Sequence, residues 1–221
     1  VGTARESTRL TIDFTNRMAE FEIDAAIVRT PSYFKARMTS EALKKHYLNL
    51  ADHSKVPILL YNIPQNTGIS MDSWLIIELS QHPNIAGIKE SSGSLAILGE
   101  VIPKVRPDFC YLLGAASVFL PGLILGACGA VLALANVAPG LCTRLFRLYM
   151  EGRKEESLKL QLDLVPLNKA IMETYGIPAI KYALDLLGFS GGQPRLPLLP
   201  LEEKGKAEIA HLLKRLGLLG S

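Results

Sequence analysis

Two short apolar runs each carry one reactive side chain near their end, and these side chains are the strongest candidates for chemistry. Residues 56–64 carry Tyr61, and residues 84–91 carry Lys89. Between them, residues 71–81 hold apolar side chains at helical spacing, which predicts a strand, a helix and a strand. Strands joined in this way are parallel, and ligands of such folds bind at the carboxyl ends of the strands. The pattern therefore predicts that a phenol and an amine face one site.

An amine at the position of Lys89 could act as a nucleophile. It follows the apolar run Ile85 to Ile88, and apolar surroundings favour the neutral form of a lysine. Because side chains alternate along a strand, Gly87 shares a face with Lys89, and we expect it to leave room for a substrate. The alternative is that Lys89 only marks where the strand reaches water. The residues alone leave both interpretations open.

The sequence also leaves two interpretations open for each of the other candidates. A tyrosine such as Tyr61 can fill core space or transfer a proton, and a neighbouring amine favours the second role. Tyr33 follows the preceding strand, so it would border the same site or pack against a partner subunit. Asn66 and Thr67 could bind a polar substrate group or form only a turn. Residues 91–93 open a helix that could hold a carboxylate, although capping alone explains the two serines.

We expect no metal and no diffusible cofactor. The histidines have no carboxylate or cysteine at ligand spacing; they are His46, His53, His82 and His211. There is also no glycine-rich phosphate loop between a strand and a helix. The chemistry would therefore be carried by side chains of the protein.

Alternating strands and helices must position these residues. Strands are predicted at 25–28, 57–63, 85–89, 111–113 and 130–135. Helices are predicted at 8–21, 39–50, 71–81, 94–105 and 117–126, and then at 140–150, 154–175, 178–187 and 201–216. Thr39 or Ser40 would cap the second helix. We predict two parts: residues 1–139 as a partial barrel and residues 140–221 as helices packed on it.

The alternation is typical of a doubly wound sheet or a (β/α)8 barrel. Five strands cannot close such a barrel, which is typically about 250 residues long. Since the first predicted element is a helix with no strand ahead of it, three βα units would lie before Val1. The expected fold is therefore an α/β TIM barrel that lacks its first three strands here and has a C-terminal helical extension.

Composition excludes several classes of partner. The chain has 221 residues, 48% of them apolar and 20% charged, and its basic residues are scattered with a net charge of only +3. This balance argues against nucleic acid as a partner. Residues 109–143 carry no charge, but proline and glycine break the run, so no membrane helix is expected. Cys110, Cys128 and Cys142 lie in apolar segments, which favours buried reduced thiols in an intracellular protein.

Four motifs, in this order, resemble those of a known enzyme family. They are Thr30-Pro31-x-Tyr33, Tyr61-Asn62-Ile63-Pro64-x-x-Thr67-Gly68, Gly87-Ile88-Lys89-Glu90 and Gly176-Ile177-Pro178. The family is that of dihydrodipicolinate synthase and N-acetylneuraminate lyase, which are Schiff-base aldolases. The resemblance covers the whole chain and implies a (β/α)8 barrel with C-terminal helices, assembled as a homotetramer that is a dimer of dimers.

The resemblance also implies roles for individual residues. Lys89 would form the Schiff base with pyruvate, Tyr61 would shuttle protons, and Tyr33 would be lent across a dimer interface to the neighbouring site. The pocket would be lined by Gly114, Ala115 and Val131, with Asn66 and Thr67 binding substrate. The family's first three strands, with a proton-relaying threonine pair, have no counterpart in this sequence.

Within the family, the sequence looks most similar to 4-hydroxy-2-oxoglutarate aldolase. Dihydrodipicolinate synthases usually have an arginine at the position of Asn66, where it binds the second substrate's carboxylate. Residues 37–38, 66–68, 80–85, 133–137 and 191–192 also look like the aldolase. The alternatives are dihydrodipicolinate synthase, another pyruvate-dependent aldolase, or a truncated and catalytically silent interaction subunit.

The expected reaction is cleavage of a small 4-hydroxy-2-oxo acid to pyruvate and glyoxylate. Lys89 would attack the 2-oxo carbon and lose water to form an iminium, while Tyr61 accepts the 4-hydroxyl proton as the carbon–carbon bond breaks. The partner would be this 2-oxo acid, with no nucleic acid and no membrane. The compartment would be the cytoplasm of a bacterium or the mitochondrial matrix of a eukaryote.

Overall fold

The computed structural model describes residues 1–220, and contacts divide the chain into two compact units. Unit 1 consists of Val1–Gly114 and Pro121–Ala130, and unit 2 consists of Ala115–Leu120 and the residues from Val131 onward. The sequence predicts a single boundary at residue 139 instead. The segment Ala115–Leu120 belongs with the later helices because Gln161 accepts a hydrogen bond from Leu120 N (2.8 Å) and donates one to Ala116 O (2.9 Å).

Unit 1 is built on a parallel sheet of five strands in sequence order. The strands are β1 (Ala26–Arg29), β2 (Ile58–Asn62), β3 (Ile85–Glu90), β4 (Cys110–Leu113) and β5 (Gly129–Ala130). Gly2 adds an isolated parallel bridge to Ile27 at the free edge of β1. The expected alternation of strands and helices is confirmed in this unit.

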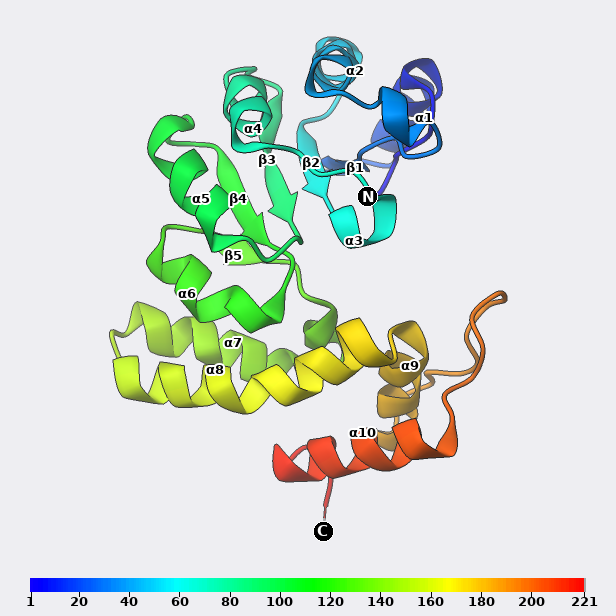
Figure 1. Cartoon of the computed structure of the whole chain (residues 1–221), viewed down its shortest axis with the longest axis vertical. Helices are drawn as coiled ribbons and strands as arrows, with labels where there is room; N and C mark the ends of the chain where they lie inside the picture. Colours follow the sequence, from blue (N-terminus) through cyan, green and yellow to red (C-terminus); the bar gives the residue numbers. More distant parts are fainter. Residues whose placement is uncertain (221) are drawn as a thin grey trace. The chain divides into compact units, whose positions relative to one another are not determined.

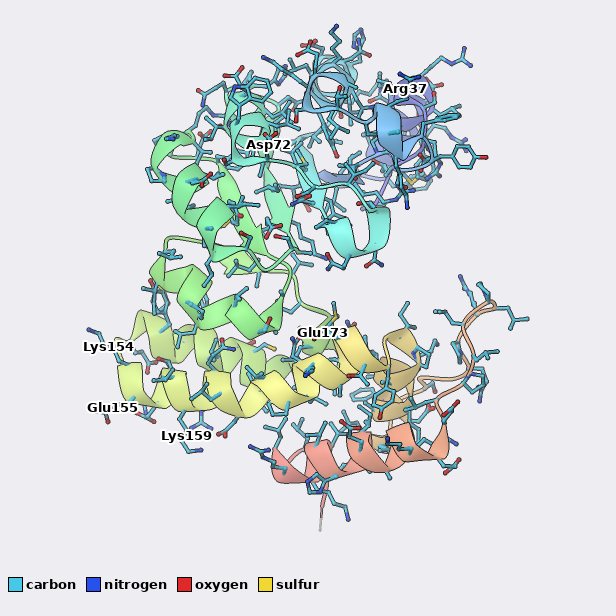
Figure 2. The ribbon with its side chains drawn as sticks, viewed as in Figure 1. Arg37, Asp72, Lys154, Glu155, Lys159 and Glu173 are labelled. Atoms are coloured by element: carbon cyan, nitrogen blue, oxygen red, sulfur yellow. A yellow bond between two sulfur atoms is a disulfide. The ribbon has the colours of Figure 1, made fainter. Side chains whose placement is uncertain are left out.

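Helices that precede or connect these strands form an arc outside the sheet (Figure 1). They are α1 (Thr8–Ala19), α2 (Ser40–His53), α4 (Ser73–Ser80) and α5 (Leu95–Val101), followed by α6 (Phe119–Ile124), which spans the boundary between the units. Thr39 caps α2 through its hydroxyl, as predicted, and Asp72 caps α4 (Figure 2).

Side chains alternate between the two faces of the sheet. Val28, Leu60 and Ile88 are fully buried. Tyr61 and Lys89 project from the other face and are half-buried. The apolar face therefore supplies the core, and the other face carries the candidate chemistry.

Two predicted segments take a different form. The strand expected over 130–135 is only two residues long, and the 3₁₀ helix η4 (Ala133–Asn136) follows it. Its neighbour β4 ends at Leu113, which pairs with Ala130, so later residues have no partner in the ladder. The turn expected at residues 66–68 is the end of a short helix, α3 (Pro64–Thr67), which Gly68 closes at φ 69°.

The prediction of three reduced cysteines is wrong for two of them. Cys110 and Cys128 form a disulfide with their Cα atoms 6.1 Å apart, and Cys142 is free and buried. Cys128 directly precedes β5, which pairs with β4, the strand that begins at Cys110. Strand pairing therefore brings the two thiols together, which a separation of 18 residues does not reveal.

Unit 2 contains the later helices. They are α7 (Pro139–Met150), α8 (Lys154–Lys169), the π-helical turn η5 (Ala170–Thr174), α9 (Ile177–Leu186) and α10 (Glu203–Arg215). Gly176 separates η5 from α9 at φ 66°, a conformation that favours glycine. Leu145, Leu167, Ile171 and Leu213 are fully buried. Across residues 1–220, none of the helices combines the length and the apolar character needed to span a bilayer.

Candidate active site

Tyr61 and Lys89 lie side by side at the carboxyl ends of β2 and β3. They are partners in the parallel register, and Lys89 Nζ lies 4.4 Å from the centroid of the Tyr61 ring. At this distance the ammonium is attracted to the aromatic face. Within residues 1–220 the Tyr61 hydroxyl makes no hydrogen bond, so it is available to a ligand. The predicted proximity of phenol and amine is confirmed, while their catalytic roles stay a prediction.

The residues that follow the two candidates form a buried polar pair. Asn62 Nδ2 donates to Glu90 Oε1 (2.9 Å), and Ser92 N donates to the same oxygen (2.9 Å). Asn62 Oδ1 accepts from Met71 N (3.0 Å), and the Glu90 residue is only 2% exposed. These hydrogen bonds hold the ends of β2 and β3 in register. Because Tyr61 and Lys89 each precede a member of the pair, it also fixes their alignment.

The expectation that Gly87 leaves room for a substrate is wrong. A Cβ atom at this position would collide with the carbonyl oxygen of Cys110 on β4. Gly87 and Cys110 are register partners, so the glycine allows the two backbones to approach closely. The glycine therefore serves the packing of β3 on β4.

The helix α3 places Asn66 and Thr67 differently. Asn66 is exposed, whereas Thr67 is buried with its hydroxyl 3.1 Å from the carbonyl oxygens of both Ile63 and Ile69. The Thr67 hydroxyl also accepts from Ile69 N (3.3 Å). These bonds stabilise the loop itself. Of the two predicted binding residues, only Asn66 has a side chain exposed for a ligand.

Tyr33 is strongly exposed, with 78% of its surface accessible. Its ring makes an edge contact with Phe34 at 4.9 Å between centroids, and Phe34 is itself 66% exposed. Its backbone is held by Glu6, whose Oε2 accepts from Ser32 N (2.8 Å) and Tyr33 N (2.9 Å). Partial burial disfavours the charged carboxylate, but these N–H donors and Arg29 outweigh it and lower the pKa of Glu6.

The three predicted lining residues belong to different units. Gly114 ends the first stretch of unit 1, where its N–H donates to Glu90 O (2.6 Å). A side chain at Gly114 would collide with the Ser91 hydroxyl. Ala115 and Val131 belong to unit 2, and Val131 is 47% exposed. The lining roles of Gly114, Ala115 and Val131 stay predictions.

Sequence reasoning missed most residues that support the site. Arg29, the register partner of Tyr61, pairs with Glu6 at 3.0 Å. The helix expected to open at residues 91–93 is capped by Ser94 instead, and Ser91 is buried with no hydrogen-bond partner for its Oγ within residues 1–220. The sequence feature that indicates the Asn62–Glu90 pair is a polar residue directly after each reactive one, as in Tyr61-Asn62 and Lys89-Glu90.

The histidines lie outside this group of residues. His46 is buried, with Nδ1 2.8 Å from Thr8 Oγ1, and burial lowers the pKa of its imidazole to about 4. His82 Nε2 lies 3.1 Å from Asp52 Oδ1. In the described residues, His, Cys, Asp and Glu side chains form no group of three or more that could hold a metal.

Comparisons with known proteins agree on one family. Its sequence model, described as the dihydrodipicolinate synthetase family, matches residues 1–216. A 4-hydroxy-tetrahydrodipicolinate synthase of Archaeoglobus fulgidus is 36% identical over 99% of this chain and 75% of the relative. The enzyme of that name from Thermodesulfovibrio yellowstonii is 35% identical over 99% of this chain and 74% of its own length.

Solved structures lead to the same family. The dihydrodipicolinate synthase of Thermotoga maritima matches with a TM-score of 0.92 and 30% identity, over 99% of this chain and 75% of that one. The enzyme from Cyanidioschyzon merolae, solved with lysine bound, matches with a TM-score of 0.93 and 28% identity, over 99% of this chain and 74% of that one. The parallel α/β fold is therefore shared with these TIM-barrel proteins. The expectation that three strands are missing ahead of Val1 receives no support from these matches.

The same findings overturn the expectation of a 4-hydroxy-2-oxoglutarate aldolase. The relatives at 32–36% identity, which extend over nearly the whole chain, are named 4-hydroxy-tetrahydrodipicolinate synthase. The expectation gave decisive weight to Asn66 and a few short segments. Similarity along the full length of the chain outweighs a single position of that kind.

Proposed function

Because the chain belongs to the dihydrodipicolinate synthetase family, we propose that it is a 4-hydroxy-tetrahydrodipicolinate synthase. As a member of this family it is an enzyme, a class I lyase that uses pyruvate through a Schiff base. The observation that carries the proposal is the placement of Lys89 against Tyr61 at the carboxyl ends of two parallel strands. The name that the relatives share supports this particular reaction.

The product's name defines the second substrate by its chemistry. A hydroxy-tetrahydrodipicolinate has seven carbons, one ring nitrogen and two carboxylates. Removing the three carbons of pyruvate leaves a four-carbon amino acid that carries an aldehyde. The 4-hydroxyl group marks the former aldehyde carbon, so the enzyme joins the pyruvate methyl carbon to that carbon.

The proposed reaction begins at Lys89. Its ammonium first loses a proton to solvent, and the neutral amine then attacks the 2-oxo carbon of pyruvate and expels water, which gives an iminium. Loss of a methyl proton gives an enamine, whose terminal carbon then attacks the aldehyde. The amino group of the second substrate displaces the Lys89 amine from the re-formed iminium and closes the ring. One water is released overall, and Lys89 is regenerated.

Tyr61 is the proposed proton carrier in these steps. Its hydroxyl makes no hydrogen bond within residues 1–220, and its ring lies beside the Lys89 ammonium. The steps require protons to leave the methyl group and to reach the new alkoxide, which a positioned phenol can provide. The Asn62–Glu90 pair keeps the two side chains aligned while the protons move.

The remaining candidates would contact substrate or a second copy of the chain. We propose that Asn66, exposed at the end of α3, contacts the second substrate, and that Gly114 lines the pocket on the side of unit 1. The lining roles of Ala115 and Val131 stay predictions. Exposed Tyr33 and Phe34 support an interface between copies, in which Tyr33 reaches a neighbouring site. A homotetramer is the proposed assembly. One solved neighbour is a monomeric variant of dihydrodipicolinate synthase, so assembly has to be measured for each chain.

Turnover with defined substrates tests this proposal. Pyruvate and the four-carbon amino aldehyde are mixed with enzyme, and the cyclic product is followed by mass spectrometry. The wild type should form the product and Lys89→Arg should not, because a guanidinium does not form the Schiff base. Lys35→Arg is the matched control and should remain active. Equal activity of Lys89→Arg and the wild type would contradict the proposal.

A further inference from the structure

The carboxylate of Glu6 binds the backbone of the loop that carries Tyr33. Glu6 Oε2 accepts hydrogen bonds from both Ser32 N (2.8 Å) and Tyr33 N (2.9 Å). Glu6 Oε1 pairs with Arg29 Nη2 at 3.0 Å. We call Glu6, Arg29 and their contacts with residues 30–33 the Glu6 clasp. It ties the loop to a residue that lies before α1 in the chain.

Arg29 completes the clasp from the sheet side. Its Nη1 donates to Thr30 O (2.9 Å) and to Ser32 Oγ (3.2 Å). Arg29 is the last residue of β1 and the register partner of Tyr61, which in turn is the partner of Lys89. The clasp is thus built on the same row of the sheet as the proposed catalytic pair.

The segment that carries Glu6 is itself anchored. Thr3 N donates to Ile27 O (3.2 Å), and Ile27 N donates to Val1 O (2.8 Å), which tie the segment to the edge of β1. Ser7 then caps α1 by accepting a hydrogen bond from Leu10 N. The backbone on both sides of Glu6 is therefore held by hydrogen bonds, on one side to the sheet and on the other in the helix cap. These bonds restrict the position of the Glu6 carboxylate.

The clasp contributes more to geometry than to stability. The side chains of Arg29 and Glu6 are 37% and 42% exposed, and ion pairs this exposed contribute about 0–1 kcal/mol. Two adjacent backbone N–H groups that converge on one oxygen, however, restrict the direction of the chain at Tyr33. The Tyr33 hydroxyl makes no hydrogen bond within residues 1–220, and its ring contacts only Phe34 among the described aromatic residues.

We propose that Glu6 is a positioning residue for Tyr33. Through the backbone of Ser32 and Tyr33, it holds the Tyr33 phenol at the place from which it acts on the reaction. This inference rests on the proposed function, in which Tyr33 reaches a neighbouring site, and adds that the phenol acts on the reaction there. The carboxylate of Glu6 is engaged by Arg29 and the loop backbone, so Glu6 would act on the reaction through Tyr33.

A double-mutant cycle tests the inference. Wild type, Glu6→Ala, Tyr33→Phe and the double variant are compared by kcat and by KM for pyruvate. Glu6→Ala should lower kcat by roughly tenfold to a hundredfold, the size of effect that follows a small misplacement of a catalytic group. The KM for pyruvate should change little. In the Tyr33→Phe background, removing Glu6 should have no further effect, because the phenol that it positions is gone.

Two further variants separate positioning from folding. Glu6→Gln keeps an acceptor oxygen for the two N–H groups and should recover most of the lost kcat. Glu41→Ala removes a glutamate from an exposed i,i+4 pair with Lys45 in the same unit and should leave kcat unchanged. Thermal melting checks that each variant is folded, and the expected loss in Glu6→Ala is one of rate with little loss of stability.

The outcomes are distinguishable. If Lys89→Arg is as active as the wild type, the proposed function fails regardless of Glu6. If Lys89→Arg is inactive but Tyr33→Phe retains full kcat, the premise about Tyr33 fails and the inference falls with it. If Tyr33→Phe is slow and Glu6→Ala is normal, or if the two losses multiply in the double variant, Glu6 does not position Tyr33 and the inference is overturned.

Discussion

At the scale of residues, Lys89 and Tyr61 meet because both precede the last residue of a strand and the strands pair in register. The pairing of Asn62 with Glu90 places Tyr61 opposite Lys89. Alternation along each strand then directs both side chains to the same face. This much could be predicted from two apolar runs, because period and parallel pairing are local rules. The clasp on Tyr33 could not, since Glu6 and Arg29 are 23 residues apart and neither belongs to a recognisable motif.

The role of the Tyr61 hydroxyl can be separated from that of its ring. Tyr61→Phe keeps the aromatic face beside the Lys89 ammonium but removes the group that would carry a proton. We expect kcat to fall by about a hundredfold or more, the usual contribution of a general acid–base group. Steady-state turnover measures the loss. A Tyr61→Phe enzyme with unchanged kcat would show that the phenol carries no proton.

His46 makes the stability of unit 1 depend on pH. Burial lowers the pKa of its imidazole from 6.5 to about 4, so the unfolded chain binds the proton more readily than the folded one. Stability should therefore fall as the pH drops below 6.5 and continue to fall until about pH 4. The contribution of His46 between pH 7 and pH 5 is about 2 kcal/mol.

Urea unfolding at a series of pH values measures this effect. In His46→Gln, an amide can still meet the Thr8 hydroxyl but does not titrate in this range. The variant should lose about 2 kcal/mol less stability than the wild type between pH 7 and pH 5. Parallel stability curves for the two proteins would show that His46 is not the titrating group.

At the scale of elements, the Asn62–Glu90 pair joins β2 to β3 at the active end of the sheet. Glu90→Ala would leave Asn62 Nδ2 and Ser92 N without their buried acceptor. Each unpaired group costs about 1–3 kcal/mol, so for the two groups we expect a loss of roughly 2–6 kcal/mol and a lower kcat. Glu90→Gln, which retains one acceptor oxygen, should be milder in both respects.

Chemical denaturation and turnover measure the two effects of Glu90→Ala together. Glu155 is the matched control, because it is an exposed glutamate that projects from α8 (Figure 2). Glu155→Ala should change neither stability nor kcat appreciably. If Glu90→Ala is no less stable than Glu155→Ala, the pair does not fasten the strands.

Local patterns predicted the long elements better than the short ones. The 3.6-residue period marked the helices of unit 2 within a few residues, because one apolar stripe must face the core. The end of the sheet was missed, since the length of β5 depends on where its neighbour β4 stops. The Cys110–Cys128 disulfide was missed for a related reason, because it forms only when those two strands are side by side.

At the scale of the whole molecule, the exposed aromatic pair predicts self-association. Tyr33 and Phe34 lie next to each other at the surface of a single chain. Phe34→Glu places a charge in this patch and should shift the protein toward the monomer. Sedimentation velocity measures the state, with Phe189→Glu, an exposed phenylalanine in unit 2, as the control. A wild type that is monomeric at assay concentration would exclude this interface.

The family could be identified from sequence, but the specific reaction could not. The order of four motifs reflects a shared fold, which constrains many positions at once. The choice between related aldolases depends on side chains that touch the second substrate, and Asn66 with a few short segments is too little sequence to decide it. The relatives favour the synthase, and under the proposed function the carboxylate of the second substrate would be bound without an arginine at that position.

Borohydride trapping tests whether Lys89 forms a Schiff base with pyruvate. The protein is incubated with pyruvate and reduced with sodium borohydride, and its peptides are mapped by mass spectrometry. We predict a reduced pyruvate adduct on Lys89 that is absent from Lys89→Arg and still present in Lys35→Arg. A folded wild-type protein with no adduct, or with its adduct on another lysine, would contradict this role of Lys89.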